Sequence, residues 1–75
     1  MTRYDPDPPY GAALRQLRQA RGLTIEEAAR RGGVTANYLG DVERGQRNPT
    51  IRVVGRILAG LRVTWAEFAQ VLNGS

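Results

Sequence analysis

Apolar residues recur at helical spacing in five segments of this 75-residue chain. In the first segment, Tyr10, Leu14 and Leu17 are separated by four and then three residues, which places their side chains on one face of a helix over residues 10–20. The same reasoning predicts further helices over residues 25–32, 36–44, 51–60 and from Thr64 onward. Five short helices in a chain of this length predict an all-α fold, a compact five-helix bundle.

The second and third predicted helices are joined by a tight turn. Thr24 followed three residues later by Glu27 is a capping box, a pattern that starts many helices, and Thr35 is a second candidate cap. Between the two helices, Gly32 and Gly33 permit the backbone angles of a sharp turn. Two helices joined in this way predict a helix-turn-helix, a motif whose second helix can lie in a DNA major groove.

The third predicted helix has an inward and an outward face. Leu39 and Val42 are three residues apart and share the inward face. The outward face is small at its start and polar beyond, and it consists of Ala36, Asn37, Gly40, Asp41 and Arg44. We expect base contacts from Ala36, Asn37, Gly40 and Asp41. Asn37 is the best base reader because its amide can bond N6 and N7 of adenine together, and Asp41 can accept from cytosine N4.

Five sequence pieces, in this order and at this spacing, resemble the Cro/cI-type (XRE-like) helix-turn-helix regulators, whose fold is lambda-repressor-like. The pieces are LRQLRQARGLT, EEAA, GVTANYLGDVERG, QRNPT and RILAGLRVTWAEF, and the resemblance covers residues 11–72. The chain looks most like small members, such as restriction-modification controller proteins and compact phage repressor domains. It departs at Ile25, where members usually carry a phosphate-binding Gln, and at Ala28, where a Leu is more usual.

The resemblance implies roles for individual residues. Family members pair an Arg at the position of Arg18 with a Glu at the position of Glu43, so we expect a structural ion pair there. Members also run the loop at residues 46–50 along the DNA backbone. We expect DNA backbone contacts from Thr24, Thr35, Tyr38, Arg44, Arg47 and Asn48. For Tyr38, packing against the protein is an equal alternative.

The last two predicted helices carry more apolar surface than one small core easily covers. One stripe of the fourth helix consists of Ile51, Val54, Leu58 and Leu61, and a second one consists of Val53 and Ile57. On the fifth helix, which opens with another capping box, one face carries Trp65, Phe68, Ala69 and Leu72. These residues can all belong to the core, or some can form a dimer seam. We favour the seam and assign to it Val53, Ile57, Trp65 and Val71.

Charge and composition narrow the choice of partner. The formal net charge is +4 and all 11 basic residues are arginine, which suits a polyanion such as DNA. Cysteine and histidine are absent from the sequence, so we expect no enzyme, no metal site and no cofactor. Without a long apolar run or a signal-like start, we expect a cytoplasmic protein with no membrane or small-molecule partner.

We divide the chain into a flexible arm over residues 1–9, in which Asp7 is a candidate helix cap, and a helix-turn-helix DNA-binding domain over residues 10–75. The predicted function is that of a sequence-specific transcriptional regulator of double-stranded DNA. Two copies form a homodimer on a pseudo-palindromic operator, with recognition helices (residues 36–44) in major grooves about 34 Å apart. The alternative is a protein-interaction module, such as an antitoxin or co-regulator subunit, with weak DNA affinity.

Overall fold

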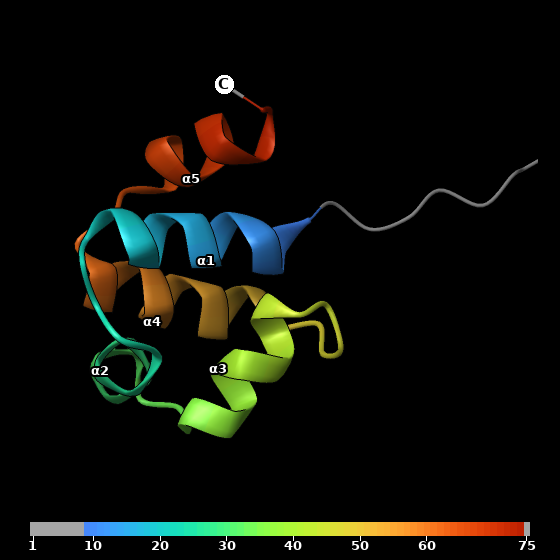
Figure 1. Ribbon diagram of the computed structural model, residues 1–75. Coiled ribbons are helices and arrows are strands. Elements are labelled where there is room, and N and C mark those ends of the chain that lie inside the picture. Colours follow the sequence, from blue (N-terminus) through green and yellow to red (C-terminus); the bar gives the residue numbers. More distant parts are fainter. Residues whose placement is uncertain (1–8, 75) are drawn as a thin grey trace, which may run out of the picture.

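A computed structural model describes residues 9–74, and this part of the chain contains five helices and no strand. The helices are α1 (Tyr10–Ala20), α2 (Ile25–Gly32), α3 (Ala36–Glu43), α4 (Ile51–Leu61) and α5 (Trp65–Leu72) (Figure 1). The predicted all-α, five-helix fold is therefore confirmed. The predicted arm and the candidate cap Asp7 lie outside the described residues, apart from Pro9.

The helices surround one hydrophobic core. α1 and α4 lie side by side, with α5 against α1 and with α2 and α3 on the other side (Figure 1). α2 packs most extensively on α4, and α1 also contacts α3. The largest fully buried side chains are Leu14, Leu39, Val42, Ile57, Leu58 and Leu61. Each such side chain contributes roughly 1.5–3 kcal/mol through its removal from water.

Four of the five helices have a threonine as their N-cap, and among these are the predicted caps Thr24, Thr35 and Thr64. One hydroxyl oxygen in each case accepts a hydrogen bond from the backbone N–H three residues later, and the four caps are Thr24, Thr35, Thr50 and Thr64. Thr24 and Thr64 form full capping boxes, because their own N–H groups donate to Glu27 and Glu67. These backbone hydrogen bonds lower the pKa of both glutamates, since they favour the charged carboxylate.

α4 ends one residue later than predicted. It continues through Leu61, and the chain reverses at Arg62, whose φ of 59° is uncommon for a residue with a side chain. Arg21 holds this reversal in place, because its Nε donates to the Leu61 carbonyl at 2.9 Å and its Nη2 donates to the Arg62 carbonyl at 2.8 Å. α3 ends one residue earlier than predicted, at Glu43.

Three glycines allow helices to approach closely. A Cβ atom added at Gly11 would overlap the carbonyl oxygen of Val42, so α1 can lie on the end of α3 only because residue 11 has no side chain. A Cβ atom added at Gly32 would lie 3.1 Å from Cγ1 of Ile57, which shows how closely α2 meets α4. Gly60 of α4 adds a third close approach, since a Cβ atom there would lie 2.8 Å from Cβ of Arg31 in α2, and together these contacts set the distance between the motif and the rest of the bundle.

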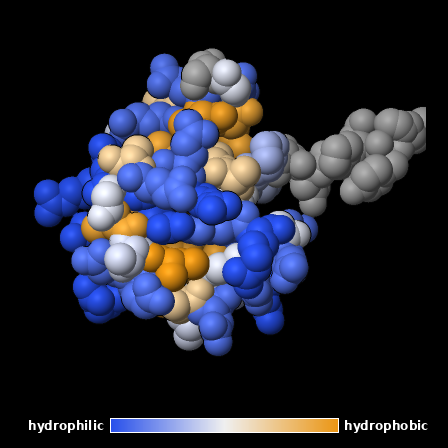
Figure 2. All heavy atoms as spheres, viewed as in Figure 1, coloured by the Kyte–Doolittle hydropathy of each residue, from blue (hydrophilic) through white to orange (hydrophobic). Residues whose placement is uncertain are grey.

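The structure contradicts part of the predicted dimer seam. Ile57 is 1% exposed because it packs against Gly32, so it belongs to the core of the protomer. Ile51, expected on the same stripe as core residues, is instead 75% exposed at the first residue of α4. Trp65 is 48% exposed, although its ring meets the edge of buried Phe68 at 6.1 Å between centroids. Hydrophobic residues reach the surface over α5, at the top of Figure 2.

The substitution Gly11→Ala tests the close crossing of α1 and α3. The added methyl overlaps backbone atoms rather than a movable side chain, so we expect the free energy of unfolding to fall by about 2–3 kcal/mol. Thermal unfolding followed by circular dichroism measures this loss, because 1 kcal/mol shifts the melting temperature of a domain of this size by roughly 4–8 °C. Ala12→Ser, at the exposed neighbouring position, is the control. Equal melting temperatures for the two variants would contradict the close crossing.

Candidate nucleic-acid interface

α2, the following turn and α3 form the predicted helix-turn-helix. Gly33 ends α2 in the left-handed conformation at φ 72°, and the N–H of Val34 donates to the carbonyl oxygen of Ala29 at 3.0 Å. Thr35 then opens α3 by accepting from the N–H of Tyr38 at 3.0 Å. Hydrogen bonds at both ends of the turn therefore hold α3 at a defined angle to α2.

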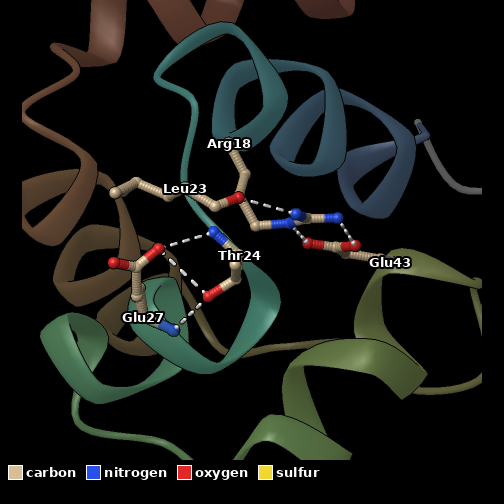
Figure 3. A network of polar contacts seen from close by, with 5 residues as sticks. All are labelled: Arg18, Leu23, Thr24, Glu27 and Glu43. Carbon is tan, nitrogen blue, oxygen red and sulfur yellow. Dashed lines mark hydrogen bonds and ion pairs between the residues drawn. The ribbon is translucent and has the colours of Figure 1, made fainter.

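Arg18 of α1 braces the C-terminal half of α3 (Figure 3). Its Nε donates to Glu43 Oε2 at 2.8 Å, its Nη2 donates to Oε1 at 3.0 Å, and its Nη1 donates to the Leu23 carbonyl at 2.9 Å. The side chains of Arg18 and Glu43 are only 13% and 5% exposed. The hydrogen bond to Glu43 raises the pKa of Arg18. One charged network thus joins α1, the turn before α2, and α3.

The two threonine hydroxyls expected at the DNA backbone already act as helix caps. The Thr24 hydroxyl accepts from the Glu27 N–H and donates to the Glu27 carboxylate, both at 3.1 Å (Figure 3). Among the described contacts, the Thr35 hydroxyl acts as an acceptor, which leaves its proton available to a phosphate oxygen. Both residues are exposed, so the start of each motif helix is open to a polyanion.

Only part of the expected base-reading face is accessible. Asn37 is exposed and Ala36 is half-buried in the first turn of α3. Gly40 is buried, since a Cβ atom added there would lie 3.0 Å from Arg44 Nη1 and 3.4 Å from Ile25 Cδ1. In this structure the Arg44 guanidinium covers Gly40, and a base contact by Gly40 stays a prediction.

Asp41 lies between the two arginines expected to contact phosphate. Its Oδ1 lies 2.6 Å from Arg44 Nη2, and its Oδ2 lies 3.9 Å from Arg47 Nε. The Arg47 guanidinium also lies 5.6 Å from the ring centroid of Tyr38, within the range of a cation–π contact. The arginine side chains remain 59% and 61% exposed. We refer to Tyr38, Asp41, Arg44 and Arg47 as the Asp41 cluster.

Arg56 is a cationic residue near α3 that the sequence reasoning missed. It lines an open surface hollow together with Val34, Thr35, Tyr38 and Val53. The available signal was the spacing of Arg52 and Arg56, which are four residues apart and both exposed on α4. Periodicity identifies such a face, but it does not reveal that the face lies beside the start of α3.

The four residues predicted for the dimer seam do not form one surface. Val53 lines the hollow beside α3, whereas Gly55 faces Trp65, whose Cζ2 lies 3.3 Å from a Cβ atom added at Gly55. Val53 and Gly55 are two residues apart on α4, so they point in directions about 200° apart. Because Gly55 faces Trp65, Val53 and Trp65 lie on different sides of α4. Val71 is partly buried against the core. The exposed apolar surface beside Trp65 continues along α4, and we call Ile51, Gly55 and Trp65 the apolar edge.

The loop between α3 and α4 places Asn48 and Arg47, a member of the Asp41 cluster, at the surface. Within residues 9–74, acidic side chains form no group of three that could hold a metal ion. None of the helices in the same range has the length and apolar character needed to cross a bilayer.

Comparisons with known proteins agree with this geometry. The profile of the helix-turn-helix family matches residues 14–68, which include all of α2 and α3. The uncharacterised HTH-type transcriptional regulator y4dJ of Sinorhizobium fredii is 39% identical over 57 residues, 76% of this chain and 74% of that protein. The HTH-type transcriptional regulator SutR of Escherichia coli is 38% identical over 55 residues, which are 73% of this chain but only 31% of SutR.

A solved structure shows the same arrangement of helices. The restriction-modification controller protein C.AhdI from Aeromonas hydrophila is 36% identical, and its structure superposes with a TM-score of 0.76. The superposition covers 81% of this chain and 92% of the controller protein. The likeness therefore extends over most of both chains and is not confined to the two motif helices.

The Arg18–Glu43 pair yields a stability prediction. Glu43→Ala leaves the guanidinium nearly buried without its partner, so we expect the free energy of unfolding to fall by about 3–5 kcal/mol. Arg18→Lys should also destabilise, because an ammonium cannot replace the bidentate guanidinium fork. Urea unfolding followed by circular dichroism measures both variants. Gln70→Ala truncates an exposed side chain of α5 as the control and should change the free energy of unfolding by at most about 0.5 kcal/mol. Similar urea midpoints for Glu43→Ala and Gln70→Ala would show that the pair does not brace α3.

Proposed function

The chain belongs to the helix-turn-helix family of XRE-like regulators, and on that premise we propose that it is a transcriptional regulator that binds double-stranded DNA at specific sequences. The observation that carries this proposal is the exposed Asn37 on α3, a helix whose far end Arg18 and Glu43 brace. The formal net charge of +4 favours a polyanionic partner. The proposed location is the cytoplasm.

In the proposed complex, α3 enters the major groove. Asn37 reads adenine through two hydrogen bonds, because its amide carries a donor and an acceptor at the spacing of N6 and N7. Ala36 is small and allows the start of the helix to come close to the base edges. Asp41 lies one helical turn after Asn37 and accepts from an amino group of cytosine or adenine.

Residues at both ends of the motif helices contact the DNA backbone in this proposal. Phosphate contacts position the protein without reading sequence. The backbone N–H groups at the start of α2 and α3 lie at one end, and we assign Thr24 and Thr35 to them. At the other end we assign Arg44, Arg47 and Asn48. Tyr38 contributes by supporting Arg47 against its ring.

We further propose that the protein forms a homodimer through the apolar edge. Ile51 and Trp65 are the large hydrophobic residues exposed in residues 9–74. Two-fold dimers place the same patch of both protomers against each other and are the commonest oligomers. A dimer of this kind would present two copies of α3 to a pseudo-palindromic operator, in major grooves about 34 Å apart.

The apolar edge also supports a second candidate function, that of a protein-interaction module such as an antitoxin or co-regulator subunit. In that case a different protein covers Ile51 and Trp65, and affinity for DNA is weak. The two candidates differ in what selection from a random DNA pool recovers at about 150 mM salt, where nonspecific phosphate contacts are weakened. A two-fold symmetric motif supports the regulator, whereas recovery without any motif supports the interaction module.

The substitution Asn37→Ala tests the base-reading role. We expect binding to the selected operator to weaken by about 1–3 kcal/mol, with preference relaxed at one base pair in each half-site. Fluorescence anisotropy with the operator and with single-base variants measures both effects. Arg47→Ala is the contrasting control and should weaken binding to every duplex, with a salt slope shallower by about one unit. Equal losses for Asn37→Ala on all sequences would exclude Asn37 as a base reader.

The substitution Trp65→Glu tests the dimer. A charge on the apolar edge should weaken self-association roughly tenfold or more, because tryptophan is enriched among the residues that dominate interfaces. Sedimentation velocity at micromolar concentrations measures the fraction of dimer. Gln70→Glu adds the same charge at another exposed position of α5 and should leave association unchanged. A wild-type protein that sediments only as a monomer would refute the dimer and favour a different partner.

A further inference from the structure

We propose that Asp41 determines specificity by restraining Arg44 and Arg47, and so weakens binding to DNA of the wrong sequence. The inference rests on the proposed DNA-binding function and deepens it. Arg44 and Arg47 follow α3 in the chain and are exposed, and the Asp41 carboxylate lies between them at 2.6 and 3.9 Å. A DNA phosphate that binds either arginine must therefore compete with the Asp41 carboxylate.

The position of the Arg44 side chain depends on the space left at Gly40 of α3 as well as on the charge of the guanidinium. Gly40 has no side chain, and the Arg44 guanidinium occupies the space over it, 3.0 Å from where a Cβ atom would stand. Arg44, the residue directly after α3, thereby folds back along the helix and donates to Asp41, three residues earlier in the chain. Because the pair is solvent-exposed, it favours this arrangement only modestly, and a phosphate can replace the carboxylate.

Arg47 is held by two contacts. Its guanidinium lies over the Tyr38 ring at 5.6 Å, and its Nε lies 3.9 Å from Asp41 Oδ2, a charge contact beyond hydrogen-bonding distance. Asp41 Oδ2 thus keeps capacity to accept a hydrogen bond. This oxygen belongs to a residue one turn after Asn37, on the face that we assign to base reading.

The carboxylate therefore responds differently to different base pairs. Cytosine N4 and adenine N6 are donors in the major groove, and either one satisfies Asp41 Oδ2. Guanine O6 and thymine O4 are acceptors, and they repel it. On a matched site Asp41 gains a hydrogen bond, whereas on a wrong site it only neutralises two cations that would otherwise bind phosphate. The resulting difference in affinity between matched and wrong sites is the discrimination that we assign to Asp41.

The test compares wild type with Asp41→Asn on the duplex selected by the wild type and on a scrambled duplex. Asparagine keeps the shape and removes the charge. We expect scrambled DNA to be bound about two- to fivefold more tightly, the scale set by an exposed ion pair. The salt slope should steepen by about one unit, as for one more phosphate contact. Affinity for the selected duplex should rise less or fall, so that the ratio of the two affinities decreases.

Glu67→Gln is the matched control, because it removes the same charge from α5, which packs on α1 and α4. Glutamine can also complete a capping box, so the fold is preserved. The control should leave the affinity ratio and the salt slope unchanged. If Asp41→Asn tightens both duplexes equally, or has the effect of the control, the inference is overturned.

A double-mutant cycle with Arg44→Ala tests whether Asp41 acts through the arginine. We expect Asp41→Asn to raise the affinity for scrambled DNA clearly less in the Arg44→Ala background than in the wild type. An equal gain in affinity in both backgrounds would mean that Asp41 repels DNA phosphates directly. That result would overturn the proposal that Asp41 acts by restraining Arg44. A wild-type protein that does not distinguish selected from scrambled DNA would instead refute the proposed function. Wild-type discrimination with an unaltered ratio in Asp41→Asn would refute only the role of Asp41.

Discussion

The contact of α1 with α3 is the constraint on which the rest of the site depends. Gly11 allows the backbones to meet, and the Arg18–Glu43 pair sets their orientation through two parallel hydrogen bonds. A nearly buried ion pair contributes little net stability, because desolvation offsets much of the attraction. Its fork geometry is nonetheless directional, so it specifies one angle of α3 where apolar packing alone would tolerate several.

α3 needs this external support because it is short. A helix of eight residues is not stable by itself in water. Its helical state depends on the Thr35 cap, on the burial of Leu39 and Val42, and on the Arg18–Glu43 brace. Because one side of α3 supplies all of this support, the other side is free to carry residues chosen for a ligand, among them Asn37 and the Asp41 cluster.

The two surfaces of the molecule differ in chemistry. Around α3 the exposed side chains are charged and amide groups, whereas the apolar edge on α4 and α5 exposes Ile51 and Trp65. A chain of 75 residues can bury only a small core, and association that covers such an edge adds to it. The separation lets a second copy cover the apolar edge while α3 stays open to DNA.

Sequence patterns predicted both ends of four helices and the start of the fifth to within one residue, because capping residues and turn glycines act over only three or four residues. The family resemblance led to the expected partners Arg18 and Glu43. Periodicity also predicted the inward face of α3, with Leu39 and Val42, but the packing of the helices was needed to show which side of α4 is inside. Ile57 is core and Ile51 is exposed, Arg44 covers Gly40, and Arg21 caps α4 from 40 residues away. Periodicity defines the faces of a helix, but the close approach of two backbones selects which faces meet.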